Sequence, residues 1–310
     1  MAETLSQNGS YGAAKAAASP TIRERSLGIY AINLDRSPDR WAAIEGHFGK
    51  LRWPLHRVKG IDARIDRDGV LAVRGQTLDL PPDGIGWSAF RNRVFTLVEE
   101  ACLSGHVLAW QQFLESDHDL ALILEDDAEP YAGFEDTMTE IVSRARAIDI
   151  IKLEGTPRRG GRLVVPAETL GQSQLVRSFR PRSGAAGYVL TRSAASRLVE
   201  AVARIHMPVD DFLWSPGLHG CSIAHVSPWV IRQSGTESTM QGDRSANKRK
   251  RRNAAPLWNA WLAVRRFGLR LSVWWHALEG RPWRLLGARI AAWSPTDLSY
   301  NEGAALAAKD

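Results

Sequence analysis

Apolar runs of strand length alternate along the chain with segments whose apolar residues recur at helical spacing. Residues 27–34, 120–124 and 149–155 are short apolar runs that stop at charged residues or glycine, as buried strands do. Apolar positions at helical spacing occupy residues 94–114, and a second helix is predicted over 134–147. Strands that alternate with helices in this way predict an α/β fold.

Turn-forming residues indicate where other elements begin and end. Ser37 and Pro38 predict a helix start, with serine at the N-cap and proline at the first helical position. Residues 69–93 contain clusters of Gly, Pro and Asp and predict a long loop or a small hairpin. Residues 185–205 predict a strand followed by a serine-capped helix, and residues 226–235 predict the last strand of the body.

Composition divides the 310 residues into three parts. Residues 1–25 are rich in Ala, Ser and Gly and lack apolar periodicity, which predicts a disordered leader. Residues 26–243 carry the alternating strands and helices and are expected to form the folded body. Residues 244–310 are basic and rich in tryptophan, and they predict a helical extension of that body.

The charge of the chain is unevenly distributed. Residues 244–294 hold twelve Arg or Lys residues and a single acid, Glu279, so this segment carries +11. Because the whole chain has a net charge of +6, the remainder carries −5. The basic character therefore belongs to the C-terminal segment, and the body is mildly acidic.

Two cysteines are too few for a disulfide framework, and neither has the sequence spacing of a zinc site. The N-terminus lacks the charged and apolar regions of a signal peptide, and no apolar run approaches the ~20 residues of a membrane-spanning helix. These features predict a cytoplasmic protein.

An acidic triplet follows the predicted strand at residues 120–124. In an extended chain Glu125 and Asp127 point to one side and Asp126 to the other. Carboxylates that converge at the carboxyl end of a strand suit a hard divalent cation such as Mg²⁺ or Mn²⁺. The alternative is a solvated acidic turn that merely ends the strand, and for an isolated triplet this is the commoner case.

Six motifs in a definite order give this triplet a context. The motifs are NLDRSPDRW (33–41), ACLSGHVLAW (101–110), LALILEDDAEP (120–130), DIIKLEG (149–155), GAAGYVLTRSAASRLV (184–199) and PVDDFLW (208–214). Together they resemble glycosyltransferase family 25, the bacterial lipopolysaccharide and lipooligosaccharide glycosyltransferases related to the collagen galactosyltransferases. The resemblance covers roughly residues 27–240.

The resemblance implies a GT-A-like fold, a nucleotide-sugar donor (commonly UDP-galactose), and a divalent metal, Mn²⁺ or Mg²⁺, at the acidic triplet. A metal that bridges the two phosphates would stabilise the charge of a diphosphate leaving group. We expect Asp127 to be the direct ligand and Glu125 the second. Asp126 is expected to contact the ribose or to orient its neighbours.

Asp210 and Asp211 form a second carboxylate pair. If the enzyme inverts configuration, one of them must accept the proton of the acceptor hydroxyl as general base, and a like-charged neighbour favours a proton on one member of a pair. The alternative is an acidic pair that caps a helix N-terminus, and the two roles are compatible.

Several other residues match the family motifs in places that suit donor binding. The polar turn after the first strand can reach the nucleotide, with arginine contacting phosphate, although a salt-bridged helix start explains the same residues. Gly187 and Tyr188 are candidates to line the sugar pocket, against packing as the alternative. The turn residues are Asn33, Asp35, Arg36 and Arg40.

His106 and Trp110 lie four residues apart and share one helix face. His106 is a candidate catalytic residue, although a lone histidine on such a face is more often part of the core. Both match the family's helix motif, as does Cys102, whereas three neighbouring positions depart from it. Those positions are Ala101, Ser104 and Gly105, where the family pattern has Gly, Leu and Ser.

The Arg- and Trp-rich segment at 244–294 has three functional interpretations: an anionic membrane surface, nucleic acid, or an intramolecular clamp over the active site. Membrane docking is preferred, because Trp favours the bilayer interface and a lipid-linked acceptor would be met there. Nucleic-acid binding through residues 248–252 is less favoured. The alternative to all three is a helical subdomain whose tryptophans pack on the body.

The sequence thus predicts an enzyme that transfers a hexose, galactose first, from a UDP-sugar to a saccharide acceptor of lipopolysaccharide or a related surface glycan, which is free or lipid-linked. It is expected to be metal-assisted and inverting, and to sit peripherally on the cytoplasmic face of the inner membrane. The alternative is a non-catalytic protein that binds membrane or nucleic acid through its basic C-terminal segment.

Overall fold

A computed structural model describes residues 25–75, 86–88, 93–145, 147–155, 162–171, 173–181, 184–203, 205–234 and 256–291. The predicted leader lies outside these residues except for Arg25, which donates hydrogen bonds to the carbonyl oxygens of Ile141 and Val142 and so belongs to the folded body. The expected boundary between residues 243 and 244 also lies outside the described residues.

The body is built on a nine-stranded mixed sheet with the order β13-β8-β9-β11-β7-β10-β5-β1-β2. Strands β1, β2, β5, β7 and β11 run in the same direction, while β10 is inserted antiparallel between β5 and β7. The carboxyl ends of β1, β5 and β7 therefore meet at one edge of the sheet. The bounds of these nine strands are β1 Leu27–Asn33, β2 Leu55–Lys59, β5 Leu120–Glu125, β7 Ile150–Lys152, β8 Arg162–Leu170, β9 Ser173–Ser178, β10 Gly187–Thr191, β11 Ile223–Ser227 and β13 Arg289–Ala291.

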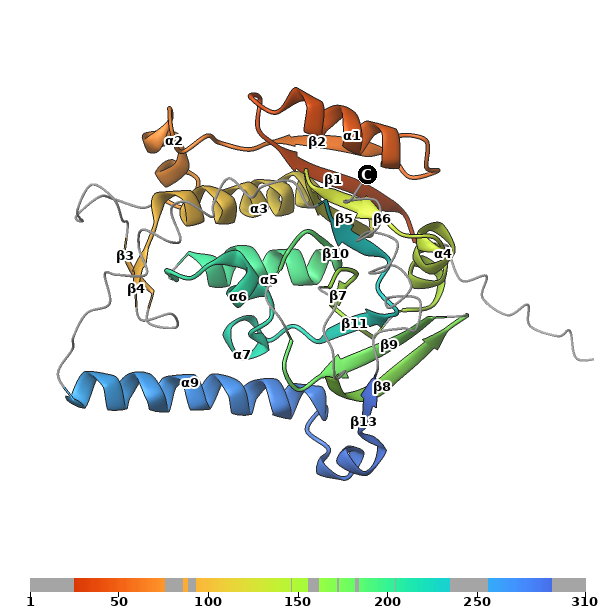
Figure 1. Ribbon diagram of the computed structural model, residues 1–310, viewed down its shortest axis with the longest axis vertical. Coiled ribbons are helices and arrows are strands. Elements are labelled where there is room, and N and C mark those ends of the chain that lie inside the picture. Colours follow the sequence, from red (N-terminus) through yellow and green to blue (C-terminus); the bar gives the residue numbers. More distant parts are fainter. Residues whose placement is uncertain are drawn as a thin grey trace, which may run out of the picture.

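Helices cover both faces of this sheet, which confirms the predicted α/β class (Figure 1). The buried strands show why, since successive side chains alternate between two cores. Tyr30 and Ile123 pack against helices on one face, and Ile29 and Leu122 pack against helices on the other. The first face carries α3 (Leu97–Glu115), α5 (Arg192–Val202) and α6 (Val209–Leu213), and the second carries α1 (Pro38–Phe48) and α4 (Phe134–Arg144).

The helix starts follow capping chemistry with one correction. Ser37 and Pro38 take the predicted N-cap and first-turn positions of α1, although the Ser37 side chain makes no capping bond. Thr96 and Glu99 form a complete capping box at α3. Helix α5 is capped by Thr191, whose hydroxyl accepts from the Ala194 N–H, so the predicted serine cap was wrong.

Two predicted segments differ in part from the structure. The small hairpin offered for residues 69–93 is confirmed by the short antiparallel strands β3 and β4, but the same segment also overlaps a helix that was not predicted, α2 (Arg67–Ala72). The predicted last strand is divided between the end of β11 and a short β12, which pairs with β6 in a separate two-stranded sheet. The bounds are β3 Gly86–Ser88, β4 Arg93–Phe95, β6 Ala128–Pro130 and β12 Ile231–Gln233.

The C-terminal segment is helical only in part. Helix α9 (Pro256–Ala277) is followed by a 3₁₀ turn, η1 (Pro282–Gly287), and by β13, which pairs antiparallel with β8 at the edge of the main sheet. An ion pair of 2.6 Å between Glu279 and Arg177 of β9 adds to this attachment. Figure 1 places α9 and β13 at the opposite end of the molecule from α1. Within the described residues, no helix combines the length and apolarity needed to cross a membrane.

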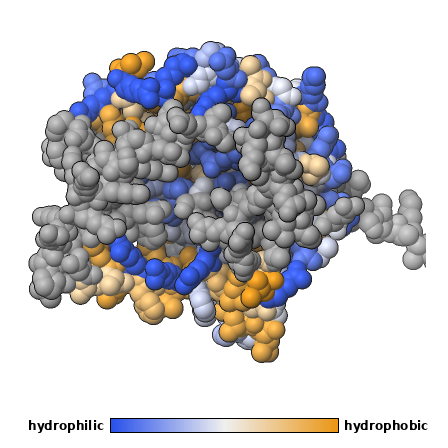
Figure 2. Space-filling view, in the orientation of Figure 1, coloured by the Kyte–Doolittle hydropathy of each residue, from blue (hydrophilic) through white to orange (hydrophobic). Residues whose placement is uncertain are grey.

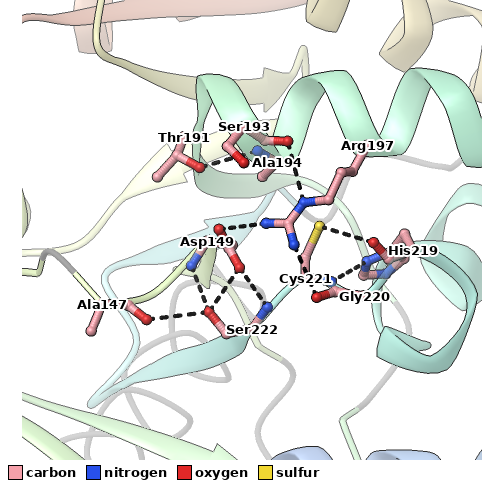
Figure 3. Close-up of polar contacts among 10 residues, drawn as sticks. All are labelled: Ala147, Asp149, Thr191, Ser193, Ala194, Arg197, His219, Gly220, Cys221 and Ser222. Carbon is pink, nitrogen blue, oxygen red and sulfur yellow. Dashed lines mark hydrogen bonds and ion pairs between the residues drawn. The ribbon is translucent and has the colours of Figure 1, made fainter.

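A hydrogen-bonded cluster joins the amino ends of β7 and β11 to α5 (Figure 3). The Asp149 carboxylate accepts from the backbone N–H and the hydroxyl of Ser222, at 2.8 and 3.0 Å. It also pairs with Arg197 of α5 at 2.6 Å, and the Ser222 hydroxyl accepts from the Asp149 N–H. Asp149 thus has a structural role, because its carboxylate oxygens have partners. Asp127, at the other edge of the sheet, differs in this respect.

Candidate active site

Four carboxylates gather at the carboxyl ends of β5 and β7. Three come from the acidic triplet of residues 125–127, at and just beyond the last residue of β5. The fourth is Glu154, two residues after β7, whose side chain is buried and electrostatically coupled to Glu125 and Asp127. Such a concentration of negative charge is costly unless cations compensate it.

The negative charge of Asp126 is balanced by partners on the α1 side of the sheet. Its carboxylate accepts from Asn33 Nδ2 at 2.9 Å and pairs with Arg40 at 2.9 Å. Asn33 is in turn fixed by donating to the Ser37 carbonyl and by accepting from Arg57 at 2.7 Å. The structure therefore brings Asn33, Arg40 and Asp126 together on the α1 side of the sheet, a grouping that the sequence did not predict.

Glu125 faces the other side of the sheet, toward α3. Its Oε1 lies 3.3 Å from His106 Nε2, and His106 Nδ1 lies 2.9 Å from the hydroxyl of Tyr188 on β10. The Trp110 indole N–H donates to the same hydroxyl at 2.8 Å. The arrangement in which Tyr188 accepts from Trp110 and donates to His106 Nδ1 gives every group a partner, and in that tautomer the N–H at Nε2 faces Glu125. Burial raises the pKa of Tyr188 well above its usual value, so it stays neutral in this relay.

Asp127 is the uncompensated member. Burial, followed by the charges of Glu125 and Asp126, raises its pKa to about 7. Its Oδ1 is buried and has no hydrogen-bond partner among the described residues. A buried carboxylate oxygen without a donor is costly, and a bound cation could relieve that cost.

The charge of Glu154 is balanced by Lys152, two residues earlier on β7. The side chains of Lys152 and Glu154 are 2% and 3% exposed, and their charged atoms lie 2.9 Å apart. Lys152 also donates to the Gly184 carbonyl at 2.6 Å and lies 4.4 Å above the ring of Trp214. Burial raises the pKa of Glu154 despite this partner. The motif at 149–155 included both charged residues, but a buried Lys–Glu pair was not predicted.

The remaining turn residues form surface ion pairs. Asp35 pairs with Lys59 at 2.6 Å and with Arg57 at 3.1 Å, and the hydrogen bond from Lys59 lowers its pKa. Arg36 pairs with Asp62 at 2.6 Å. For Asp35 and Arg36 the structure supports the alternative interpretation, which is a salt-bridged helix start.

Gly187 and Tyr188 are engaged inside the protein. The Tyr188 side chain is fully buried, so it acts on the site through His106 and exposes no surface to a sugar. A Cβ at Gly187 would lie 2.5 Å from Ile231 Cδ1, which explains the glycine by packing. The structure therefore favours the packing alternative for Gly187 and places Tyr188 behind His106, away from any sugar pocket.

Helix α6, which carries the second acidic pair, packs beside the aromatic residues that support His106. Asp210 and Asp211 lie in its first turn, where Asp211 is buried and Asp210 Oδ1 has no hydrogen-bond partner within the described part of the chain. Phe212 packs on Trp110 with ring centroids 6.4 Å apart, and Trp214 packs on Tyr188 at 6.2 Å. The N-cap residue is Pro208, and both aspartates occupy the first turn of α6, where negative charge is favourable to the helix dipole.

Cys102 also joins this neighbourhood, although sequence spacing gave no reason to consider it. Cys102 and His106 are one helical turn apart on α3, and their ligand atoms lie within 4.8 Å of each other and of a Glu125 oxygen. A thiol and an imidazole are softer ligands than the carboxylates beside them. These three side chains are therefore close enough together to hold a metal ion.

Comparison with known proteins identifies the family to which the chain belongs. Residues 26–213 match the model of glycosyltransferase family 25, described as an LPS biosynthesis protein. The chain therefore belongs to glycosyltransferase family 25. The match ends at the last residue of α6 and leaves α9, η1 and β13 outside it.

A curated relative agrees with the family. It is a glycosyltransferase 25 family member of Aedes aegypti, which is 27% identical over 206 residues. The aligned region covers 63% of this chain but only 32% of the relative. The chain thus spans about a third of the length of that relative, and only the shared domain is compared.

Proposed function

We propose that this glycosyltransferase moves a hexose from a UDP-sugar to a saccharide acceptor with the help of a divalent cation. The observation that carries the proposal is the unpartnered, buried oxygen of Asp127 among three further carboxylates. Galactose is the first candidate for the sugar, from the family resemblance. The description of the matched family model supports a lipopolysaccharide or related surface glycan as acceptor, free or lipid-linked.

The residues of the acidic site fit Mn²⁺ or Mg²⁺. Asp127 would be the direct ligand through the oxygen that lacks a donor, and Glu125 would be the second, held in place by His106. When bound, the cation would neutralise the diphosphate leaving group. Asn33 and Arg40 hold Asp126 in place, and Asp126 is proposed to contact the ribose.

Asp210 and Asp211 are proposed to supply the general base of an inverting transfer. A base must lie in the acceptor site and accept the hydroxyl proton as the new bond forms. The buried and unpartnered Oδ1 of Asp210 supports that member of the pair.

Replacing the base should reduce turnover by roughly 10²–10⁴-fold, the usual contribution of general-base catalysis. We expect this loss in Asp210→Asn or in Asp211→Asn, with the affinity for the donor unchanged, because the base acts on the acceptor. Steady-state kinetics with donor and acceptor varied separately measures both quantities. Full turnover in both variants would remove the pair from the mechanism.

Tyr188→Phe should lower transfer by roughly 10–100-fold, the range seen when the partner of a metal-ligand residue is lost. The variant keeps the ring but removes the hydroxyl that fixes His106, so Glu125 loses its orientation. A weaker apparent affinity for Mn²⁺, measured as the concentration that gives half-maximal activity, should accompany the loss. Unchanged metal dependence would show that the tyrosine serves packing alone.

A panel of nucleotide sugars in a thermal-shift assay, with and without Mn²⁺, tests the proposed donor. The account expects one UDP-hexose to raise the melting temperature more in the presence of Mn²⁺ than in its absence, because ligand binding stabilises the folded state. An equal shift without metal, or no shift with any donor, would contradict the proposal.

A further inference from the structure

The exposed apolar side chains of the protein are concentrated in the C-terminal segment. Twelve large hydrophobic side chains are exposed in the described part of the chain, and ten of them lie between residues 261 and 290. Figure 2 shows orange areas along the lower rim of the molecule, where Figure 1 places α9, η1 and β13. A patch of this kind on a folded protein usually marks an interaction surface. The ten residues are Trp261, Val264, Phe267, Leu271, Trp274, Trp275, Trp283, Leu285, Leu286 and Ile290.

Helix α9 has two apolar faces, only one of which contacts the body. Leu262 and Ala277 are buried on the inner face, and Ser272 lies against Gly217 of the neighbouring helix α7 (Pro216–His219). At about 100° per residue, the exposed residues Val264 and Leu271 lie on the opposite face. The outer face is therefore not explained by packing on the body.

Arginines border the outer apolar face on both sides. The same helical geometry places Arg265 on one flank and Arg270 on the other. The guanidinium of Arg265 lies 5.3 Å from the ring of Trp261, so aromatic and cationic groups are presented together. Residues 256–291 contain six arginines and one acid, Glu279, which is paired with Arg177 and Arg284.

The 3₁₀ turn after α9 continues this surface. Leu286 is 93% exposed and Trp283 is 67% exposed, and both lie on η1. Arg281 is exposed at the start of the turn, and Ile290 is exposed on β13. Aromatic, aliphatic and cationic side chains thus extend from the helix to the edge of the sheet.

We propose that α9 and η1 form a docking surface for an anionic lipid bilayer. An interfacial helix buries an apolar face at the boundary between headgroups and acyl chains, while its arginines bind the anionic headgroups. Tryptophan is enriched at this depth of a membrane. The surface lies outside residues 26–213, which match the family, so the inference is independent of the proposed sugar transfer.

The composition of the surface decides against two other partners. Nucleic acid would use the arginines and the aromatic rings, but it gives no role to Val264, Leu271, Leu286 and Ile290. A second copy of the chain in a twofold interface would bring two arginine-rich surfaces together with few acids to compensate them. An anionic bilayer would bury the aliphatic side chains and bind the arginines through its headgroups.

The full chain should bind vesicles of phosphatidylglycerol and phosphatidylcholine in co-sedimentation, and its tryptophan fluorescence should shift to the blue. Added salt should weaken the binding. The double variant Phe267→Ser/Leu286→Ser should bind at least tenfold more weakly. Ile65→Ser is the matched control, because Ile65 is 86% exposed far along the sequence from this surface, and it should bind like the natural chain.

Arg265→Gln/Arg270→Gln tests the charges, and we expect a loss of roughly fivefold per arginine. Arg64→Gln should leave binding unchanged. Equal binding to pure phosphatidylcholine, or equal binding by the apolar double variant and the Ile65 control, would overturn the proposal. The proposal would also be overturned if the chain did not bind vesicles but was retained on DNA. The same holds if it did not bind vesicles but formed a dimer that the apolar double variant dissociates. Each variant is checked for an unchanged melting temperature.

Discussion

Asp127→Asn is expected to lower sugar transfer by at least ~10²-fold and at the same time to make the metal-free protein more stable. The substitution keeps the size of the side chain but removes the charge that the proposed cation requires. It also removes the repulsion from Glu125 and Asp126 that raises the Asp127 pKa to about 7. Transfer assays and thermal unfolding of the same preparation measure the two effects.

The pH dependence of this stability has a definite sign. The Asp127 pKa is 3.8 ordinarily and about 7 in the folded protein, so the folded state holds a proton that the unfolded chain has lost. The stability present below about pH 4 is therefore lost progressively as the pH rises to about 7, by up to about 4 kcal/mol. The advantage of Asp127→Asn over the natural chain should grow across the same interval.

Asp149→Asn provides the matched control. The same chemical change is made at an aspartate whose oxygens accept hydrogen bonds and an ion pair at the opposite edge of the sheet. It should lower stability and leave the apparent affinity for Mn²⁺ unchanged. An Asp127→Asn variant that loses stability as Asp149→Asn does would show that Asp127 is an ordinary structural acid.

Lys152→Met is expected to destabilise the protein by about 3–5 kcal/mol, the usual result of removing one member of a buried ion pair. Lys152 and Glu154 are both almost fully buried, so the variant leaves the Glu154 carboxylate without its cation and close to Glu125 and Asp127. Urea-induced unfolding measures the change.

Two further variants separate charge from packing at this pair. Lys152→Met/Glu154→Gln removes both charges and should recover part of the lost stability. The Lys152→Met defect should also become smaller as the pH falls, because the raised pKa of Glu154 lets that carboxyl take up a proton. Arg197→Met, at a half-exposed pair with Asp149, should cost only about 1 kcal/mol. Equal losses at the two pairs would contradict the account.

The parts of the fold that the sequence predicted are those with strong local signals. The continuous apolar run that becomes β5 and the helical periodicity that becomes α3 both predicted their elements within a few residues. The β8–β9 hairpin was missed because Pro166 interrupts its first strand, where the pairing with β9 has a bulge. Strand β13 pairs with β8 across more than a hundred residues, a contact that local patterns do not contain.

The candidate site, too, was predictable only where the local sequence pattern determines it. Strand alternation alone separated Asp126 from Glu125, and the structure places them toward α1 and α3. The relay from Trp110 through Tyr188 to His106 depends on β10 lying beside β5, so it follows from topology and not from spacing. The Lys152–Glu154 pair required the same knowledge of which strands are neighbours.

Calorimetric titration of Mn²⁺ into the full chain in the presence of UDP tests the central claim most directly. The account predicts that binding is tighter at about pH 8 than at about pH 6, because Asp127 must lose its proton to bind the cation. It further predicts that binding is lost in Asp127→Asn and retained in Asp149→Asn. Binding of equal strength in Asp127→Asn and in the natural chain would contradict it.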